Sequence, residues 1–470
     1  MKLNPASISK IALVMVLTEG VMNFAMAQEK HALTVKQAVE YAKKNSVQVK
    51  NILLDVKLQE ETNRQVTANA YPKIDGRIGA TYNPNIAVQS FPNFIALGTY
   101  GVIEAEDIRR GNGSAIKTPS DIGLIQAQFG TKYVANAGVD LSQLLFDGQV
   151  FVGLQARETS MQWVRKNVEV TEELIKANVH KVYYQLVVGK TQIDLLDANI
   201  ARLLKLQNDT RELYKNGFAE KLDVDKVTVQ IVNLETEKKK ALNQISNGYL
   251  SLKLLIGMPV KDELVLTDTL SDSQIKDGML EASAYNYSDR KEYQYAELGK
   301  KLNEYNIKRY KLSQIPTVSL SSSWSKNAQR NKFDFFGKGD WYTFSNINLN
   351  ISIPIFHGFT TRSKIDEAKL NLQKTVNQMD YLKLTIDNEV ETARTNFKTA
   401  TESMDYQKQN MKLAEDVYEQ TKKKYEAGLG SNTEITAAQT DLKSAQTNYI
   451  NALYDAIVAR IDYLKAIGKL

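Results

Sequence analysis

Residues 347–356 have the sequence INLNISIPIF, in which bulky apolar side chains occupy every second position. Alternation of this kind predicts a β-strand with one apolar face. Residues 317–325 (TVSLSSSWS) alternate in the same way shortly before it, and residues 74–82 and 133–141 do so in the first half of the chain. The sequence therefore predicts four strands. Each is about ten residues long, the length of a tilted strand that crosses a bilayer.

The predicted strands also have polar faces and aromatic residues near their ends. Asp75 and Arg77 lie opposite the apolar residues of the first strand, and Tyr133 and Trp324 lie close to strand ends. This combination is typical of a transmembrane strand with a wet inner face and aromatic girdles at the membrane surfaces. A soluble sheet with one solvated face is the alternative that the strands alone leave open.

Very long helices follow the strands. The stretch 360–425 contains no proline or glycine, and its apolar residues recur every three or four positions, as in a coiled coil. At 1.5 Å per residue, a helix of about 65 residues spans roughly 100 Å. The first half predicts an equivalent helix at 149–214, and shorter helices are predicted at 222–256 and 433–467. Such helices need partner helices, and four strands cannot close a barrel, which takes about eight. Both arguments predict an oligomer.

The two halves of the chain share landmarks at a constant offset. A YxxG motif ends at Gly217 and again at Gly428, 211 residues later. Both glycines are predicted helix C-caps, where a positive φ is needed. The expected domains are a first repeat (28–259), a connecting segment (260–283) and a second repeat (284–470). The first repeat carries extra residues at 90–130, which predict a long loop between two strands.

The N-terminus predicts a secretory signal peptide over residues 1–27. Lys2 and Lys10 are followed by the short apolar run 11–17, and Ala25-Met26-Ala27 forms a typical cleavage site. The apolar run is shorter than the roughly 20 residues that a helix needs to span a bilayer.

Composition argues against an enzyme or a nucleic-acid binder. The chain has no cysteine and only three scattered histidines, so we predict no catalytic residues, no metal site and no cofactor. The net charge of +6 is mild, and basic residues alternate with acidic ones along the helices. A nucleic-acid binder usually concentrates its basic residues on one face.

The order of these features resembles the TolC-like outer-membrane efflux family. The stretches that carry the resemblance are LTVKQAVEYAKKNSVQVK (33–50), the strand starts Tyr71-Pro72 and Ile315-Pro316, LLFDG (144–148), PIFHG (354–358) and both YxxG turns. The resemblance implies a homotrimer in which four strands from each protomer build one transmembrane β-barrel in the outer-membrane lipid. It also implies a coiled-coil helical barrel in the periplasm, a periplasmic adaptor (membrane fusion) protein and an inner-membrane efflux pump.

The resemblance further suggests a gate near the YxxG turns. Of the two acidic residues that line the family's constriction, one corresponds to Glu434, whereas the other position holds Ala437. The family's link between the second-repeat tyrosine and an acid of the first repeat corresponds to Tyr425 and Asp223. The basic residue of that lock is replaced by Gly430. The alternative for Glu434 is an ordinary acidic residue at a helix start, and the alternative for Tyr425 is a residue that packs against a helix end.

Three functions remain open at this point. The leading interpretation is a passive exit duct of a tripartite efflux system, and the second is an outer-membrane duct for type I protein secretion. A soluble periplasmic coiled-coil adaptor is the third, but it would lack the amphipathic strands. The sequence does not separate the first two.

Overall fold

The computed structural model describes residues 30–269, 275, 285–337 and 339–470. The predicted signal peptide, and the connecting segment from residue 270 onward apart from Ile275, lie outside the described residues. The chain divides into two compact units. Unit 1 comprises residues up to Gln59, Thr159–Lys301 and Leu372–Leu470, and unit 2 comprises Glu60–Glu158 and Leu302–Asn371.

The helices match the sequence prediction closely. The two long ones are α5 (Gly148–Lys215) and α9 (Thr360–Glu426), and the helices that return from them are α6 (Lys221–Ile256) and α10 (Asn432–Ala466). Other helices of the described residues are α2 (Val35–Asn45), α3 (Val47–Ala68), α8 (Lys291–Leu312), the short η1 (Tyr287–Asp289) and α4 (Phe94–Ala105), which was not predicted. No helix in the described parts of the chain has an apolar stretch suited to crossing a membrane.

Unit 1 is held together along the apolar seams of these helices. One core cluster joins α2 to α5 and α6 and contains the fully buried Tyr183. The seam predicted on α9 packs against α10: Ile386 and Phe397 belong to one buried cluster with Tyr463, and the rings of Phe397 and Tyr463 stack with centroids 5.8 Å apart. Nearer the turns, residues of α5, α6, α9 and α10 share a single cluster that includes Leu203 and Leu442. All four helices therefore pack together at that end of the unit.

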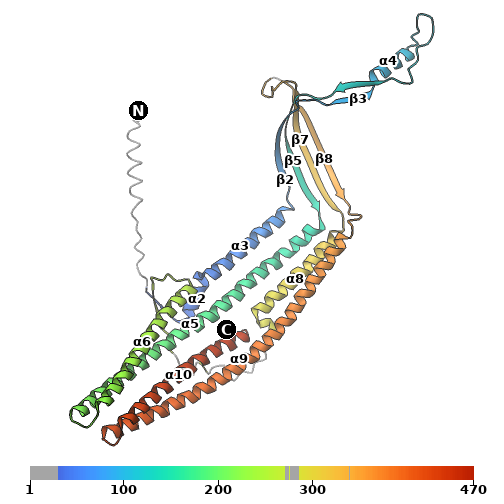
Figure 1. Cartoon of the computed structure of the whole chain (residues 1–470). Helices are drawn as coiled ribbons and strands as arrows, with labels where there is room; N and C mark the ends of the chain where they lie inside the picture. Colours follow the sequence, from blue (N-terminus) through green and yellow to red (C-terminus); the bar gives the residue numbers. More distant parts are fainter. Residues whose placement is uncertain (1–29, 270–274, 276–284, 338) are drawn as a thin grey trace, which may run out of the picture. The chain divides into compact units, whose positions relative to one another are not determined.

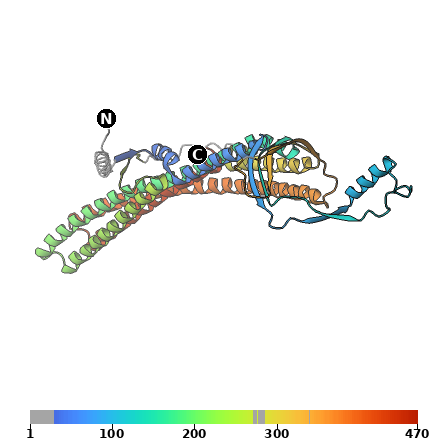
Figure 2. The ribbon, with the colours of Figure 1, turned by 90° about the horizontal axis from the view of Figure 1, so that it is seen from above.

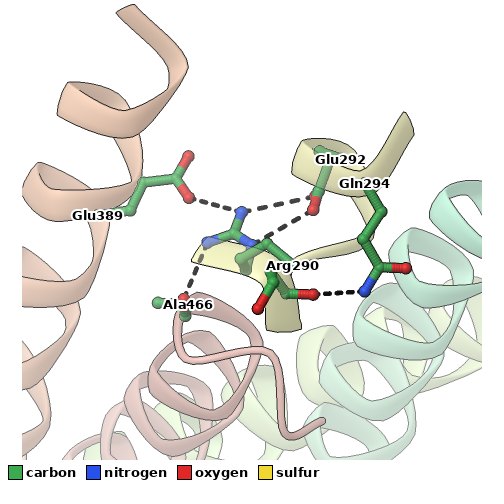
Figure 3. Close-up of polar contacts among 6 residues, drawn as sticks. Arg290, Glu292, Gln294, Glu389 and Ala466 are labelled. Atoms are coloured by element: carbon green, nitrogen blue, oxygen red, sulfur yellow. Dashed lines mark hydrogen bonds and ion pairs between the residues drawn. The ribbon is translucent and has the colours of Figure 1, made fainter. Parts of the chain in front are cut away.

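A buried arginine ties the start of α8 to α9 and α10 (Figure 3). Arg290 is 4% exposed. Its guanidinium donates to the carbonyl of Ala466 at 2.9 Å, to Glu389 at 2.9 Å and to Glu292 at 3.3 Å. The carbonyls of a last helical turn have no partner within the helix. Arg290 therefore satisfies the end of α10 while two carboxylates balance its charge.

Unit 1 also contains a small parallel sheet that the sequence did not predict. Strand β1 (Lys30–Leu33) pairs with β6 (Glu263–Leu266). Each has four residues, which is too short for alternation to stand out from chance.

Unit 2 contains a four-stranded antiparallel sheet in the order β2-β5-β7-β8. Its strands are β2 (Lys73–Tyr82), β5 (Tyr133–Phe146), β7 (Thr317–Arg330) and β8 (Tyr342–Ser352). The register places Leu349 opposite Leu320 and Ile351 opposite Val318. The apolar side chains of the edge strands are unusually exposed: Ile78 is 90% and Ile347 is 77% exposed.

The four predicted strands are present, but the predicted end of the last one is wrong. β8 stops at Ser352, whereas the alternation continues to Phe356. Pro354 has no N–H to donate to a strand neighbour. The chain then turns through Gly358 and Phe359, which both have positive φ, of 56° and 63°. The turn leads directly into α9.

The prediction of a long loop at 90–130 is also wrong. The segment contains α4 (Phe94–Ala105), and its flanking strands β3 (Val88–Pro92) and β4 (Leu124–Gln128) form an antiparallel pair. The side chain of Asn93 accepts a hydrogen bond from the N–H of Ala96 and caps the helix at 2.9 Å. Residues 83–132, named the arm below, extend away from the sheet at the end opposite to α3 (Figures 1 and 2).

Candidate gate at the helix turns

The two YxxG turns lie at the same end of unit 1 (Figure 1). Gly217 and Gly428 have φ of 79° and 72°, the left-handed conformation in which glycine avoids a Cβ clash. The N–H of Phe218 donates to Leu213, and the N–H of Leu429 donates to Lys424 in the same way. These bonds are those of a Schellman motif. Each turn thus closes its long helix and reverses the chain into the returning helix.

Tyr425 bridges α9 to α5. Its hydroxyl lies 3.1 Å from Oγ1 of Thr210, which is completely buried. The Thr210 hydroxyl donates to the carbonyl of Leu206 at 2.8 Å. Tyr425 is therefore the donor in the bond between the two side chains. Sequence reasoning missed Thr210, because a threonine within a long helix carries no distinctive pattern.

Asp223 is not hydrogen-bonded to Tyr425 in this structure. Its carboxylate accepts the backbone N–H of Glu220 at 3.3 Å, and the pair forms a capping box at the start of α6. Its backbone carbonyl instead accepts a bond from the side chain of Asn432 at 3.3 Å. The first and second halves of the chain are thus linked here by Asn432 at the start of α10.

Glu434 lies in the first turn of α10. Its backbone N–H donates to the side chain of the N-cap residue Ser431 at 3.2 Å. Its carboxylate accepts a bond from Nζ of Lys424 at 3.0 Å, and both side chains are half exposed. The hydrogen bond from Lys424 lowers the pKa of Glu434 below its ordinary value. The carboxylate therefore stays negative at neutral pH while it is paired with a neighbouring cation.

A polar layer interrupts the apolar seam between α5 and α10 above the turns. Asn199 donates to Oε1 of Gln446 at 2.7 Å and accepts from Nε2 of Gln439 at 2.6 Å. All three side chains are buried. The signal was visible in the sequence, because these amides occupy seam positions in register with Leu203 and Leu442. A buried polar group in a coiled coil fixes its register at a cost in stability.

The described residues contain no group of three metal-ligating side chains. Burial lowers the pKa of His180 to about 4, so this histidine is neutral at pH 7. At the turn end, the contacts described above are hydrogen bonds and an ion pair, and they join neighbouring helices.

Known proteins share both the sequence pattern and the fold. Residues 289–469 match the family described as outer membrane efflux protein. The chain is 24% identical over 365 residues to the toluene efflux pump outer membrane protein TtgC of Pseudomonas putida, covering 76% of this chain and 74% of the relative. It is 20% identical over 341 residues to the outer membrane protein TolC of Vibrio cholerae, covering 71% and 77%.

Solved structures agree over almost the whole length. The fold matches that of CusC with a TM-score of 0.73 at 16% identity, covering 95% of each chain. It matches the outer membrane protein VceC of Vibrio cholerae with a TM-score of 0.67 at 15% identity, covering 92% and 96%. In sequence and in fold the chain is therefore similar to TolC-like outer membrane efflux proteins.

Proposed function

We propose that this protein is the outer-membrane exit duct of a tripartite efflux system, which conducts substrates passively to the exterior. The observation that carries the proposal is a sheet with two unpaired edge strands and an exposed apolar face among the described residues, whose strands lead directly into helices of 68 and 67 residues. The names of its relatives as efflux pump outer membrane proteins favour efflux over protein secretion.

The working form in this proposal is a homotrimer. Each protomer leaves the outer edges of β2 and β8 unpaired within the described sheet. Pairing β8 of one copy with β2 of the next would satisfy both edges, and twelve strands from three copies would close one barrel. The apolar residues of β8 would then face lipid, and the helices would continue the duct through the periplasm.

The domain organisation belongs to the same proposal. A signal peptide (1–27) directs the chain to the periplasm, and two repeats (28–259 and 284–470) are joined by an equatorial connecting segment (260–283). An adaptor protein and an inner-membrane pump would meet the duct at its turn-bearing end. The protein itself would perform no chemistry, because conduction through a duct needs none.

The gate is proposed at the two turns. Three Glu434 carboxylates around a threefold axis would make the narrow end attractive to cations. The bond from Tyr425 to Thr210 and the bond from Asn432 to the carbonyl of Asp223 would hold the second-half hairpin (α9 and α10) against the first-half hairpin (α5 and α6) in the closed position. Release of these contacts would let the second-half hairpin move away from the first.

Single-channel recording in planar bilayers tests the proposal. The wild type should give small, discrete, cation-selective openings, and Glu434→Ala should weaken the selectivity. Glu212→Ala removes a similarly exposed acid near the end of α5 and should leave the selectivity unchanged. If neither substitution changes the selectivity of the openings, the protein conducts as a duct but Glu434 is not its gate. A protein that never conducts, and that fractionates with soluble periplasmic proteins, would refute the duct.

A further inference from the structure

The arm presents an apolar helix that no described part of the protomer covers. α4 has the sequence FIALGTYGVIEA, and none of its residues is buried. Phe94 is 54%, Ile95 57% and Val102 62% exposed. A helix that is apolar on all sides is normally buried. An exposed apolar surface of this kind marks an interaction site.

The arm has regular secondary structure and side-chain contacts that hold α4 in place. Five register pairs join β3 to β4, and the rings of Phe91 and Phe129 pack edge to face with centroids 5.2 Å apart. Thr118 donates to Glu104 at 2.9 Å, which ties the returning chain to the last turn of α4. The apolar helix is therefore displayed by a folded hairpin.

A lipid surface is a poor partner for α4. A helix that lies in the membrane interface needs a strongly charged face beside its apolar one. Glu104 is the one charged residue of α4, and it lies in the last turn. Its 12 residues are also too few to cross a bilayer, which takes about 20. Another protein helix fits the surface better.

We propose that α4 packs against the α4 helices of the neighbouring copies and that together they form an apolar lid over the outer mouth of the duct. This inference rests on the proposed trimer. The arm leaves the sheet at the end opposite to α3, which is the outer end in that assembly (Figures 1 and 2). Each of the copies would bring an identical helix to the same mouth.

The dimensions of the arm allow this contact. Twelve strands about 4.8 Å apart and tilted by about 40° enclose a barrel of roughly 12 Å radius. The five-residue hairpin spans about 17 Å, and α4 adds about 18 Å. The arm therefore reaches past the threefold axis, so three arms can meet there.

The surface of α4 suits close contact with copies of itself. A Cβ added at Gly98 or Gly101 would meet nothing within 4 Å among the described residues, so another helix backbone can approach on that side. The central residues carry no charge, so three identical helices do not repel one another there. The charged residues Asp107, Arg109 and Arg110 follow the helix and would remain in water at the tip of the arm.

Cysteine cross-linking tests the lid, because the chain has no cysteine of its own. Gly101→Cys and Ala96→Cys probe two faces of α4 in the intact protein in nanodiscs. Asn112→Cys, in the turn beyond the helix, is the control. Mild oxidation should convert most of at least one α4 variant to a disulfide-linked dimer, while the control stays monomeric on a denaturing gel. Leu97→Gln with Val102→Gln, which makes the surface polar without adding charge, should increase the unitary conductance without changing the selectivity.

The outcomes separate the lid from the duct. If native mass spectrometry shows a trimer that conducts, and neither α4 variant gives a cross-link, the proposed lid is wrong and the proposed duct still stands. A fluorophore attached to the thiol of the Gly101→Cys variant reports on lipid contact. Its quenching by brominated phospholipids would place α4 in the bilayer and also overturn the lid. A protein that is not trimeric overturns the proposed assembly itself.

Discussion

Replacing Tyr425 by phenylalanine removes one hydroxyl group and leaves the ring in place. Among the described residues, the structure gives this hydroxyl one partner, Thr210, on the opposite long helix. A net hydrogen bond contributes about 0.5–1.5 kcal/mol. If the bond exists only in the closed state, its loss raises the open-to-closed ratio by roughly 2- to 12-fold for each protomer, since 1.4 kcal/mol corresponds to a factor of ten.

Open probability in single-channel recordings measures this change directly. Tyr214→Phe is the matched control, because Tyr214 occupies the same position in the first turn and its half-exposed side chain makes no hydrogen bond within the described residues. Thr210→Val should open the channel to a similar extent. The double variant should add little to either single one, because both remove the same bond. Additive effects, or an equal effect of Tyr214→Phe, would refute the assignment.

Three further outcomes are expected. Arg290→Met should lower the free energy of unfolding by about 1–3 kcal/mol, because it leaves the Ala466 carbonyl without its donor and two partly exposed carboxylates without their cation; thermal melts should show no such loss for the exposed Arg394→Met. Cation selectivity should fall on acidification as Glu434 takes up a proton. Because Lys424 lowers the pKa of that carboxyl, Lys424→Met should move the loss of selectivity to higher pH. Reversal potentials measured as a function of pH test this, and a loss that moves to lower pH would contradict it. Asn199→Ala should cost about 2–4 kcal/mol in urea unfolding, because two buried amides lose a partner; a loss below about 0.5 kcal/mol would contradict the buried layer.

The long elements of this fold could be predicted because each repeats one simple pattern many times. The apolar residues of α9 recur over 67 residues, so chance departures do not obscure the period. Its predicted bounds, 360–425, differ from the observed ones by a single residue. Gly189 lies within α5 and does not interrupt it. A Cβ at this position would lie 3.2 Å from a side-chain carbon of Ile245 of α6, so the position favours glycine. Close packing of the two helices explains a glycine that local propensity would disfavour.

The structure of the arm was not predicted, because many residues of its sequence favour loops although the segment forms a helix and two strands. Two glycines lie within α4, and the flanking segments are rich in proline, glycine and asparagine, which favour loops. The capping contact of Asn93 and the pairing of β3 with β4 are what decide in favour of structure. The pairing joins residues more than thirty positions apart, which no local pattern reports.

The contacts between the first-half helices α5 and α6 and the second-half helices α9 and α10 weaken toward the YxxG turns. This decrease determines where the two pairs of helices can separate. Away from the turns, Met404 and Ala456 are fully buried in the shared core. At the turns, Phe218 is 81% and Leu429 is 77% exposed, and the side chains of the ion pair between Lys205 of α5 and Glu426 of α9 are 64% and 47% exposed. Exposed ion pairs contribute at most about 1 kcal/mol. Separation of the turns alone therefore breaks few favourable contacts, while the cluster that contains Leu203 and Leu442 and the apolar seam beyond the polar layer keep the helices together.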